Sequence, residues 1–152
     1  MDERAFARTV EDYATRLYAV AYRLLGNRSD AEDAVQRALL KAYEARGSYS
    51  SRWAVSTWLY RVLTNVCIDE LRRRRHVPPE PLPRGRPGTS VERLDLRRAL
   101  ETVPREARVL LALHYVNGLG YHELAAIRGI SVNTVKSQLA RGKAILRRAL
   151  ED

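Results

Sequence analysis

Cysteine and histidine are scarce in this sequence of 152 residues, which contains one cysteine and three histidines. A single cysteine cannot form an internal disulfide, so the chain is not a disulfide-stapled secreted domain, and a reducing cytoplasm is its natural setting. No paired carboxylates, nucleophile arrangement or metal-spaced ligands accompany the scattered histidines. His114 and His122 flank a predicted turn but have no third ligand nearby, which leaves a zinc site there as a minor alternative. We therefore expect neither an enzyme nor a cofactor.

Long apolar runs are also missing. The longest, residues 109–113, is far shorter than the roughly 20 residues that a helix needs to cross a bilayer. Residues 1–14 lack the apolar core of a signal peptide. The alternation of apolar and polar residues that is typical of strands does not occur. These absences predict an all-α, soluble, cytoplasmic protein that does not insert into membranes.

Positive charge, by contrast, is abundant. Lysine and arginine together number 27 against 18 acidic residues, which gives a formal net charge of +9. Such an excess favours a polyanionic partner, although it can also serve solubility alone. Four consecutive arginines, residues 72–75, end a predicted helix. A run of this kind is either a solvated basic tail or a contact for a phosphate backbone.

Proline is concentrated in one stretch, since residues 76–88 contain five of the six prolines. This stretch predicts a linker between two all-helical domains, residues 1–75 and residues 89–152. We expect the two domains to be separable and mobile in the free protein, because such a linker cannot join their cores. Apolar spacings of three and four predict the helices on either side of it. One of these helices is expected to start at a capping-box pattern formed by Ser29 and Glu32.

Residues 119–150 predict two helices with a tight break, as in a helix-turn-helix. Gly129 suits the position just past a helix end, and Ser131 suits the N-cap of the next helix. The second helix carries an apolar stripe that includes Val135 and Leu139, and its remaining face is polar and basic. A recognition helix in the DNA major groove requires such a face. Gly142 within this helix is expected to cost about 1 kcal/mol of helix propensity relative to alanine.

Three blocks of the sequence together resemble a known family. They are residues 30–45 (DAEDAVQRALLKAYEA), residues 56–75 (STWLYRVLTNVCIDELRRRR) and residues 101–146, which begin ETVPREARVLL. In this order and spacing they resemble bacterial RNA polymerase sigma factors of the sigma-70 family, extracytoplasmic-function (ECF) group. The resemblance extends from about Tyr13 to Leu150. It implies a dissociable initiation subunit whose partners are core RNA polymerase, promoter DNA and, where one exists, an anti-sigma factor.

The resemblance also implies roles for individual residues. The first domain would bind polymerase and open the −10 promoter element, and the second would read the −35 element. The implied polymerase contacts are Asp30, Glu32, Asp33, Gln36, Leu39, Leu40 and Lys41. The implied −10 contacts are Tyr49, Ser50, Ser51, Arg52, Arg61, Asn65, Arg72, Arg73, Arg74 and Arg75. The implied −35 contacts are Ser131, Asn133, Thr134, Lys136, Ser137, Gln138, Arg141 and Lys143.

One alternative is a stand-alone helix-turn-helix transcriptional regulator, in which the first domain only dimerises or senses a signal. The block of residues 56–75 and the polar aromatic loop before it argue against this alternative. A dimerisation domain has no need of such a loop beside four arginines.

Overall fold

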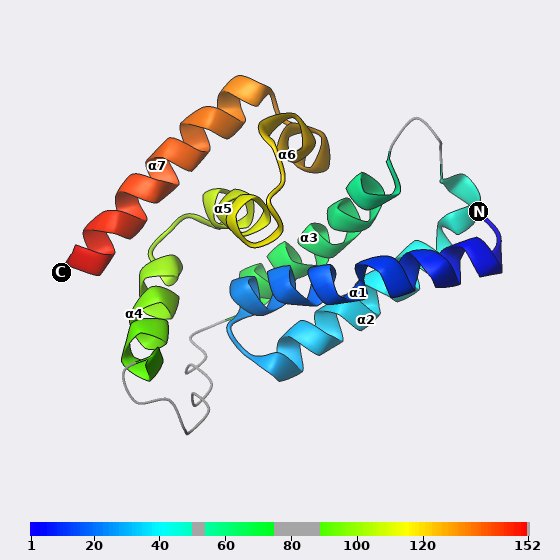
Figure 1. Ribbon diagram of the computed structural model, residues 1–152, viewed down its shortest axis with the longest axis horizontal. Coiled ribbons are helices and arrows are strands. Elements are labelled where there is room, and N and C mark those ends of the chain that lie inside the picture. The colour runs from blue at the N-terminus through cyan, green and yellow to red at the C-terminus, as the bar shows by residue number, and fades with distance from the viewer. Residues whose placement is uncertain (50–53, 75–88, 152) are drawn as a thin grey trace.

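The computed structural model describes residues 1–49, 54–74 and 89–151 (Figure 1). The predicted linker, residues 76–88, therefore lies outside the described residues, as do the predicted contacts Ser50, Ser51, Arg52 and Arg75. Helices account for nearly all of the described chain, and no strand occurs in it, which confirms the all-α prediction. The helices are α1 (Glu3–Leu25), α2 (Arg28–Glu44), α3 (Val55–Arg73), α4 (Thr89–Glu101), α5 (Arg105–Asn117), α6 (Tyr121–Arg128) and α7 (Val132–Glu151), with a 3₁₀ turn at Arg46–Ser48.

Local capping explains where the first two helices begin and end. The Asp2 side chain accepts a hydrogen bond from the Ala5 N–H at 2.8 Å, and Gly26 ends α1 in the left-handed region with φ of 81°. The predicted capping box at Ser29 is wrong. Asn27 is the N-cap instead, because it follows the Gly26 turn in an extended conformation and its Oδ1 accepts from the Asp30 N–H at 2.8 Å.

Helices α1, α2 and α3 pack together as the N-terminal half of the molecule. The face of α2 that packs inward is almost entirely small, and its buried members are Ala31, Ala34, Val35, Ala38 and Ala42. Small side chains let helices approach closely, so the larger side chains of α1 and α3 fill the space around them. Leu17, Leu59 and Leu63 are each at most 2% exposed. Burial of one such leucine contributes roughly 1.5–3 kcal/mol.

Helix α5 is the centre of the C-terminal half, and α7 lies against it. The apolar run at residues 109–113 is buried along α5. Gly142 of α7 sits on this surface: a Cβ atom there would lie 3.1 Å from Leu111 Cδ1 and 3.2 Å from the Ala107 Cβ. The sequence predicted only a cost in helix propensity at Gly142. The structure shows that the missing side chain allows α7 to approach α5 closely.

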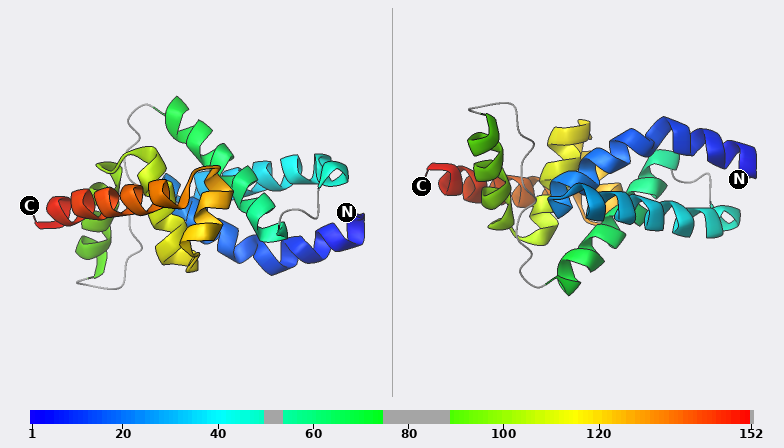
Figure 2. Two further views of the ribbon diagram at one scale, coloured as in Figure 1. Left: turned by 90° about the horizontal axis from the view of Figure 1, so that it is seen from above. Right: turned by 90° about the horizontal axis from the view of Figure 1, so that it is seen from below.

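The two halves also pack on each other, and their buried residues form one continuous core. Helix α5 lies on α1, and α6 lies on α3 (Figures 1 and 2). Asn117 at the end of α5 donates to the Tyr60 hydroxyl at 2.7 Å and to the Arg16 carbonyl at 3.1 Å. This arrangement differs from the expected pair of separately mobile domains, because helix faces rather than the linker join the two cores. None of the helices in the described parts of the chain is long and apolar enough to cross a membrane.

Candidate nucleic-acid interface

Helices α6 and α7 form the predicted helix-turn-helix. Gly129 ends α6 with φ of 65°, and the Ile130 N–H donates back to the Ala125 carbonyl at 3.1 Å. Ser131 caps α7, since its Oγ accepts from the Thr134 N–H at 3.0 Å. Both predicted capping roles are confirmed. The Ser131 hydroxyl is also 2.9 Å from the Thr134 hydroxyl, so both side chains support the turn.

The predicted DNA-reading face lies on the side of α7 that turns away from the core. Val135 and Leu139 are buried, whereas Asn133, Lys136 and Ser137 are exposed. Gln138 is half-buried and lines a polar cleft of about 300 Å³ between α7, α5 and the end of α3. Its other lining residues are Ile68, Arg72, Pro104, Arg105, Glu106 and Arg141. One cleft thus brings together predicted contacts for both promoter elements. Arg72 is a predicted −10 contact, and Gln138 and Arg141 are predicted −35 contacts.

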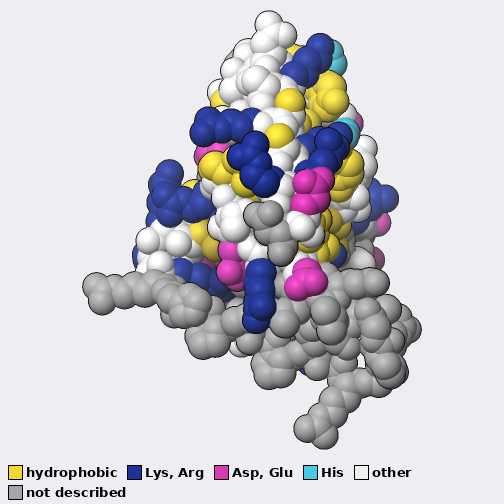
Figure 3. Space-filling model, turned by 90° about the vertical axis from the view of Figure 1, so that its left-hand side faces the viewer, with side chains coloured by type: hydrophobic (Ala, Val, Ile, Leu, Met, Phe, Trp, Pro, Cys, Tyr) yellow, Lys and Arg dark blue, Asp and Glu magenta, His cyan; other side chains and the backbone are white. Residues whose placement is uncertain are grey.

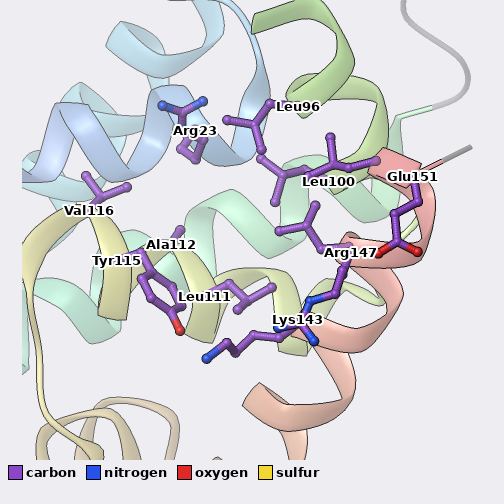
Figure 4. Close-up of a pocket in the computed structure, with 12 residues that line it drawn as sticks. Arg23, Leu96, Leu100, Leu111, Ala112, Tyr115, Val116, Lys143, Arg147 and Glu151 are labelled. Carbon is purple, nitrogen blue, oxygen red and sulfur yellow. The ribbon is translucent and has the colours of Figure 1, made fainter. Parts of the chain in front are cut away.

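Lys143 stands apart from the other predicted −35 contacts. Its ammonium group lies 5.5 Å from the centre of the Tyr115 ring, at the edge of a mostly apolar groove of about 720 Å³ between α4, α5 and α7 (Figure 4). Leu96, Leu100 and Leu111 line the groove. Lysine and arginine side chains surround exposed hydrophobic ones at this end of the molecule (Figure 3). A cation over an aromatic ring is attracted by the ring's quadrupole, which favours this position of the exposed Lys143 side chain.

The predicted −10 contacts are divided between α3 and the segment before it. The Tyr49 ring centre lies 5.1 Å from that of Trp58, with the ring planes tilted by 46°, and Trp58 is a residue that the sequence did not single out. The sequence feature that could have identified Trp58 is its position as an aromatic residue shortly after the polar aromatic loop. On α3, Arg61 Nε donates to the Ala126 carbonyl at 2.9 Å, and Asn65 Oδ1 accepts from Arg128 at 3.1 Å. Helix α6 therefore covers this side of α3.

The arginine run at the end of α3 is not uniform. Arg72 and Arg73 are exposed, with Arg72 4.0 Å from Asp69. Arg74 instead points inward, where its guanidinium donates to the Leu25 carbonyl at 2.7 Å and to Asp30 Oδ2 at 2.6 Å. Its side chain is only 16% exposed. In this structure Arg74 holds the end of α3 to the turn between α1 and α2.

Helix α2 carries the predicted polymerase contacts, and they also differ from one another. The Asp30 carboxylate accepts from the Asn27 amide at 3.0 Å, and this bond together with Arg74 lowers the pKa of Asp30 below its ordinary value. Asp30 is thus part of the internal structure. Glu32, Gln36 and Leu40 are exposed and share one helix face through their spacing of four. Asp33 and Lys41 are exposed beside that face, while Leu39 packs against the core.

Comparisons with known proteins identify the family. The Sigma-70 region 2 model matches residues 9–77, and the Sigma-70 region 4 model matches residues 93–146. The ECF RNA polymerase sigma factor SigW of Bacillus subtilis is 32% identical over 99% of this chain and 91% of its own. The chain belongs to the ECF sigma factors.

A further relative and a solved structure are also similar to this chain. ECF RNA polymerase sigma factor SigM of Mycobacterium tuberculosis (strain H37Rv) is 34% identical over 98% of this chain and 79% of its own. The solved structure of the sigma factor RpoE in complex with the anti-sigma factor NepR, from Bartonella quintana, aligns with a TM-score of 0.78. That alignment covers 97% of this chain and 98% of RpoE at 24% identity, so it shows a shared fold.

One contact between the two halves of this sigma factor was missed by the sequence reasoning. Arg128, the last residue of α6, is only 10% exposed and contacts both halves of the molecule. Nothing in its sequence context distinguishes it from other helix-ending arginines. Its partners lie 22 and 64 residues away, so only the fold reveals them.

Cys67 and potential metal ligands add no further site. Burial raises the pKa of the Cys67 thiol to about 12, which leaves little of the reactive thiolate. Within the described ranges, no group of three or more His, Cys, Asp or Glu side chains could hold a metal ion.

Proposed function

We propose that this sigma factor binds core RNA polymerase and directs transcription initiation from promoters, with residues 1–75 acting at the −10 element and residues 89–152 at the −35 element. The observation that carries the proposal is the pair of family matches, region 2 and then region 4, in one chain. The alternative of a stand-alone regulator is not favoured, because a region 2 match spans most of the N-terminal half.

The face of α7 supplies the chemistry for reading the −35 element. Asn133, Ser137 and Gln138 lie in the N-terminal part of the helix, which reaches base edges in other helix-turn-helix proteins. Their amide and hydroxyl groups can both donate and accept hydrogen bonds, as base reading requires. Lys136 and Arg141 are exposed cations suited to phosphates, which fix position rather than sequence.

Helix α3 and the segment before it supply the chemistry for the −10 element. An unstacked base needs a flat side chain to rest on, and the Tyr49–Trp58 pair offers two. Arg61 and Asn65 offer hydrogen bonds to such a base, and Arg72 and Arg73 offer charge to the phosphates. Arg74 is left out of this set because it is bound internally.

The exposed face of α2 is the proposed polymerase contact, with Leu40, 59% exposed, as its apolar centre. Bond formation belongs to the polymerase, so this chain supplies binding and no chemistry of its own. We place it in the cytoplasm, where polymerase and genomic DNA are found. An anti-sigma factor is a further proposed partner, supported by the complex of RpoE with NepR.

The test is transcription in vitro with core polymerase on a genomic fragment library. The wild-type chain should support initiation at a defined set of promoters. Glu32→Lys with Asp33→Lys should weaken co-purification with core polymerase and reduce initiation. Glu11→Lys with Asp12→Lys is the matched control, because these neighbouring acidic residues are equally exposed but lie on α1. If both double variants bind core polymerase like wild type, α2 is not the contact; if wild type initiates nowhere, the function itself fails.

A further inference from the structure

Three side chains join the end of α2 to the start of α1, near the N-terminus (Figure 1). The Tyr43 hydroxyl donates to Glu3 Oε1 at 2.9 Å, and Arg46 Nη2 lies 3.8 Å from the same oxygen. The Arg46 guanidinium carbon lies 3.8 Å from the centre of the Tyr43 ring. Each of the three residues therefore contacts the other two. Glu3, Tyr43 and Arg46 are called the Arg46 cluster below.

Arg46 also begins the 3₁₀ turn that follows α2. Its Nη1 donates to the Tyr43 carbonyl at 2.8 Å, at a helix end where carbonyls lack partners within the helix. Its own carbonyl accepts from the Tyr49 N–H at 3.3 Å, and the Ser48 N–H donates to the Ala45 carbonyl at 2.9 Å. The cluster thus holds the turn to α1, and the hydrogen bonds of the turn hold Tyr49.

Tyr43 gives the cluster a fixed base. Its ring meets Phe6 edge-on, with ring centres 5.5 Å apart and ring planes at 67°, and Phe6 is buried in the core. The Arg46 cation is attracted both to this ring and to the Glu3 carboxylate. Its side chain is only 27% exposed, whereas Arg72 and Arg73 are exposed cations suited to phosphates. The guanidinium of Arg46 therefore serves contacts within the protein.

Tyr49 connects the turn to the aromatic pair of the proposed −10 site. It follows the turn directly, and its ring centre lies 5.1 Å from that of Trp58 near the start of α3. The backbone direction at the end of the turn therefore sets where the Tyr49 ring lies relative to Trp58. An unstacked base binds best to rings that are already in place, because ordering a side chain on binding costs free energy.

We propose that Arg46 is a positioning residue for −10 recognition: through the Arg46 cluster it fixes the turn after α2 and thereby holds Tyr49 beside Trp58 for an unstacked base. The inference rests on the proposed function, since it takes these two rings as −10 contacts. Arg46 acts through Tyr49 and needs no contact with DNA. Loss of the cluster lowers the fraction of molecules in which the two rings are in place, and the apparent affinity for the −10 strand falls with that fraction.

Four variants change the cluster in different ways. Arg46→Ala removes the cation from the Tyr43 ring and from Glu3. Tyr43→Phe removes only the hydroxyl that donates to Glu3 and keeps the ring on Phe6. Glu3→Ala removes the shared acceptor at an exposed position. Arg46→Lys keeps the charge but cannot reach the Tyr43 carbonyl and Glu3 with one planar group, so it should fall between wild type and Arg46→Ala.

The first measurement reports the surroundings of Trp58 without DNA or polymerase. In a Trp53→Phe background of the full-length chain, Trp58 is the only tryptophan, and its near-ultraviolet circular dichroism depends on the ring beside it. Arg46→Ala should reduce this signal while far-ultraviolet circular dichroism shows intact helices. Arg8→Ala, an exposed cation of α1, should leave it unchanged. Tyr43→Phe decides the question if Arg46→Ala loses helix content. An unchanged signal in both variants overturns the proposal, whether or not the chain proves to be a functional sigma factor.

The second measurement reports −10 binding by the full-length chain bound to core polymerase. The probe is a labelled single strand carrying a −10 element transcribed in the assay above, and the controls are a random strand of equal length and a −35 duplex. Removal of an acidic side chain ordinarily strengthens DNA binding, because it lessens repulsion of the phosphates. Glu3→Ala should instead weaken binding to the −10 strand by roughly three- to tenfold and leave binding to the −35 duplex unchanged. Glu11→Ala, with the same charge change at another exposed position of α1, should weaken neither.

Two results of this measurement would overturn the proposal. One is binding of the −10 strand by Glu3→Ala as tight as that of wild type or tighter. The other is an equal loss on the −35 duplex, which would show general damage to the protein. If wild type does not prefer the −10 strand to the random strand, the proposed function itself fails, while the circular dichroism of Trp58 still decides whether Arg46 positions Tyr49.

Discussion

Asp30 connects three helices through one carboxylate. It accepts from Asn27 at the start of α2 and from Arg74 at the end of α3, and Arg74 also reaches the last carbonyl of α1. The Asn27 bond is the main cause of its lowered pKa, with Arg74 adding to it against the opposing effect of burial. A carboxyl group whose pKa is lowered by folding stabilises the folded state only while it is ionised.

We predict that Asp30→Asn lowers the free energy of unfolding at about pH 7, and that the difference from wild type shrinks as the pH falls toward about 3. The sign follows from the pKa shift: the stabilisation is present above the unfolded-state pKa and is lost as the pH falls through the lower folded-state pKa. Urea unfolding of both proteins across this pH range measures the effect. Glu32→Gln, at an exposed position of the same helix, is the control and should change stability little. A pH-independent difference for Asp30→Asn would show that its charge is not what matters.

For single residues, the sequence predicted the role correctly where the hydrogen-bond partner is nearby in the chain. Gly129 and Ser131 were predicted correctly because a helix end and an N-cap depend on residues within one turn. Arg74 and Arg128 could not be assigned in this way. Both are arginines at helix ends, a position that suits cations generally, and their specific partners come from other helices.

The helices themselves were predicted well, because amphipathic spacing is a local property. The start of α2 was placed at the wrong cap since Asn27 and Ser29 are both good N-cap residues, and the preceding Gly26 turn decides between them. The packing between α1 and α5 could not be predicted. Periodicity shows which face of a helix is apolar, but it does not show which other helix covers that face.

Gly142 provides a test of helix packing. We predict that Gly142→Ala destabilises the protein by roughly 1 kcal/mol, even though alanine is the better helix former by about the same amount. The new methyl group would approach Ala107 Cβ, which its own helix backbone holds in place. Chemical denaturation measures the change. Ala140→Gly, at an exposed position of α7, is the control and should lose about 1 kcal/mol from propensity alone. If Gly142→Ala were more stable than wild type, α5 would have to shift and make room for the methyl group on α7.

The molecule as a whole is elongated, with the two termini at opposite ends of its long axis, yet it has one core (Figure 1). Sequence reasoning separated the chain into two units because the proline-rich stretch interrupts the helical pattern. It could not reveal that the free chain folds back on itself, because that depends on the complementarity of faces far apart in the sequence. Continuity of the core implies that the free energy of the interface is shared by both halves.

We therefore predict that the free protein unfolds in one cooperative transition. Both tryptophans, Trp53 and Trp58, belong to the N-terminal half, so their fluorescence reports on that half, whereas far-ultraviolet circular dichroism reports on all helices. The two transitions should coincide in urea.

Asn117→Ala removes the hydrogen bond to the Tyr60 hydroxyl between the halves, and Tyr60 is only 2% exposed. It should shift both transitions together by about 1–2 kcal/mol, because that hydroxyl loses its partner. Asn133→Ala, at an exposed position of α7, should shift neither. If fluorescence and circular dichroism instead gave separate midpoints in wild type, the two halves would be thermodynamically independent, and the shared core would contribute little to the stability of either.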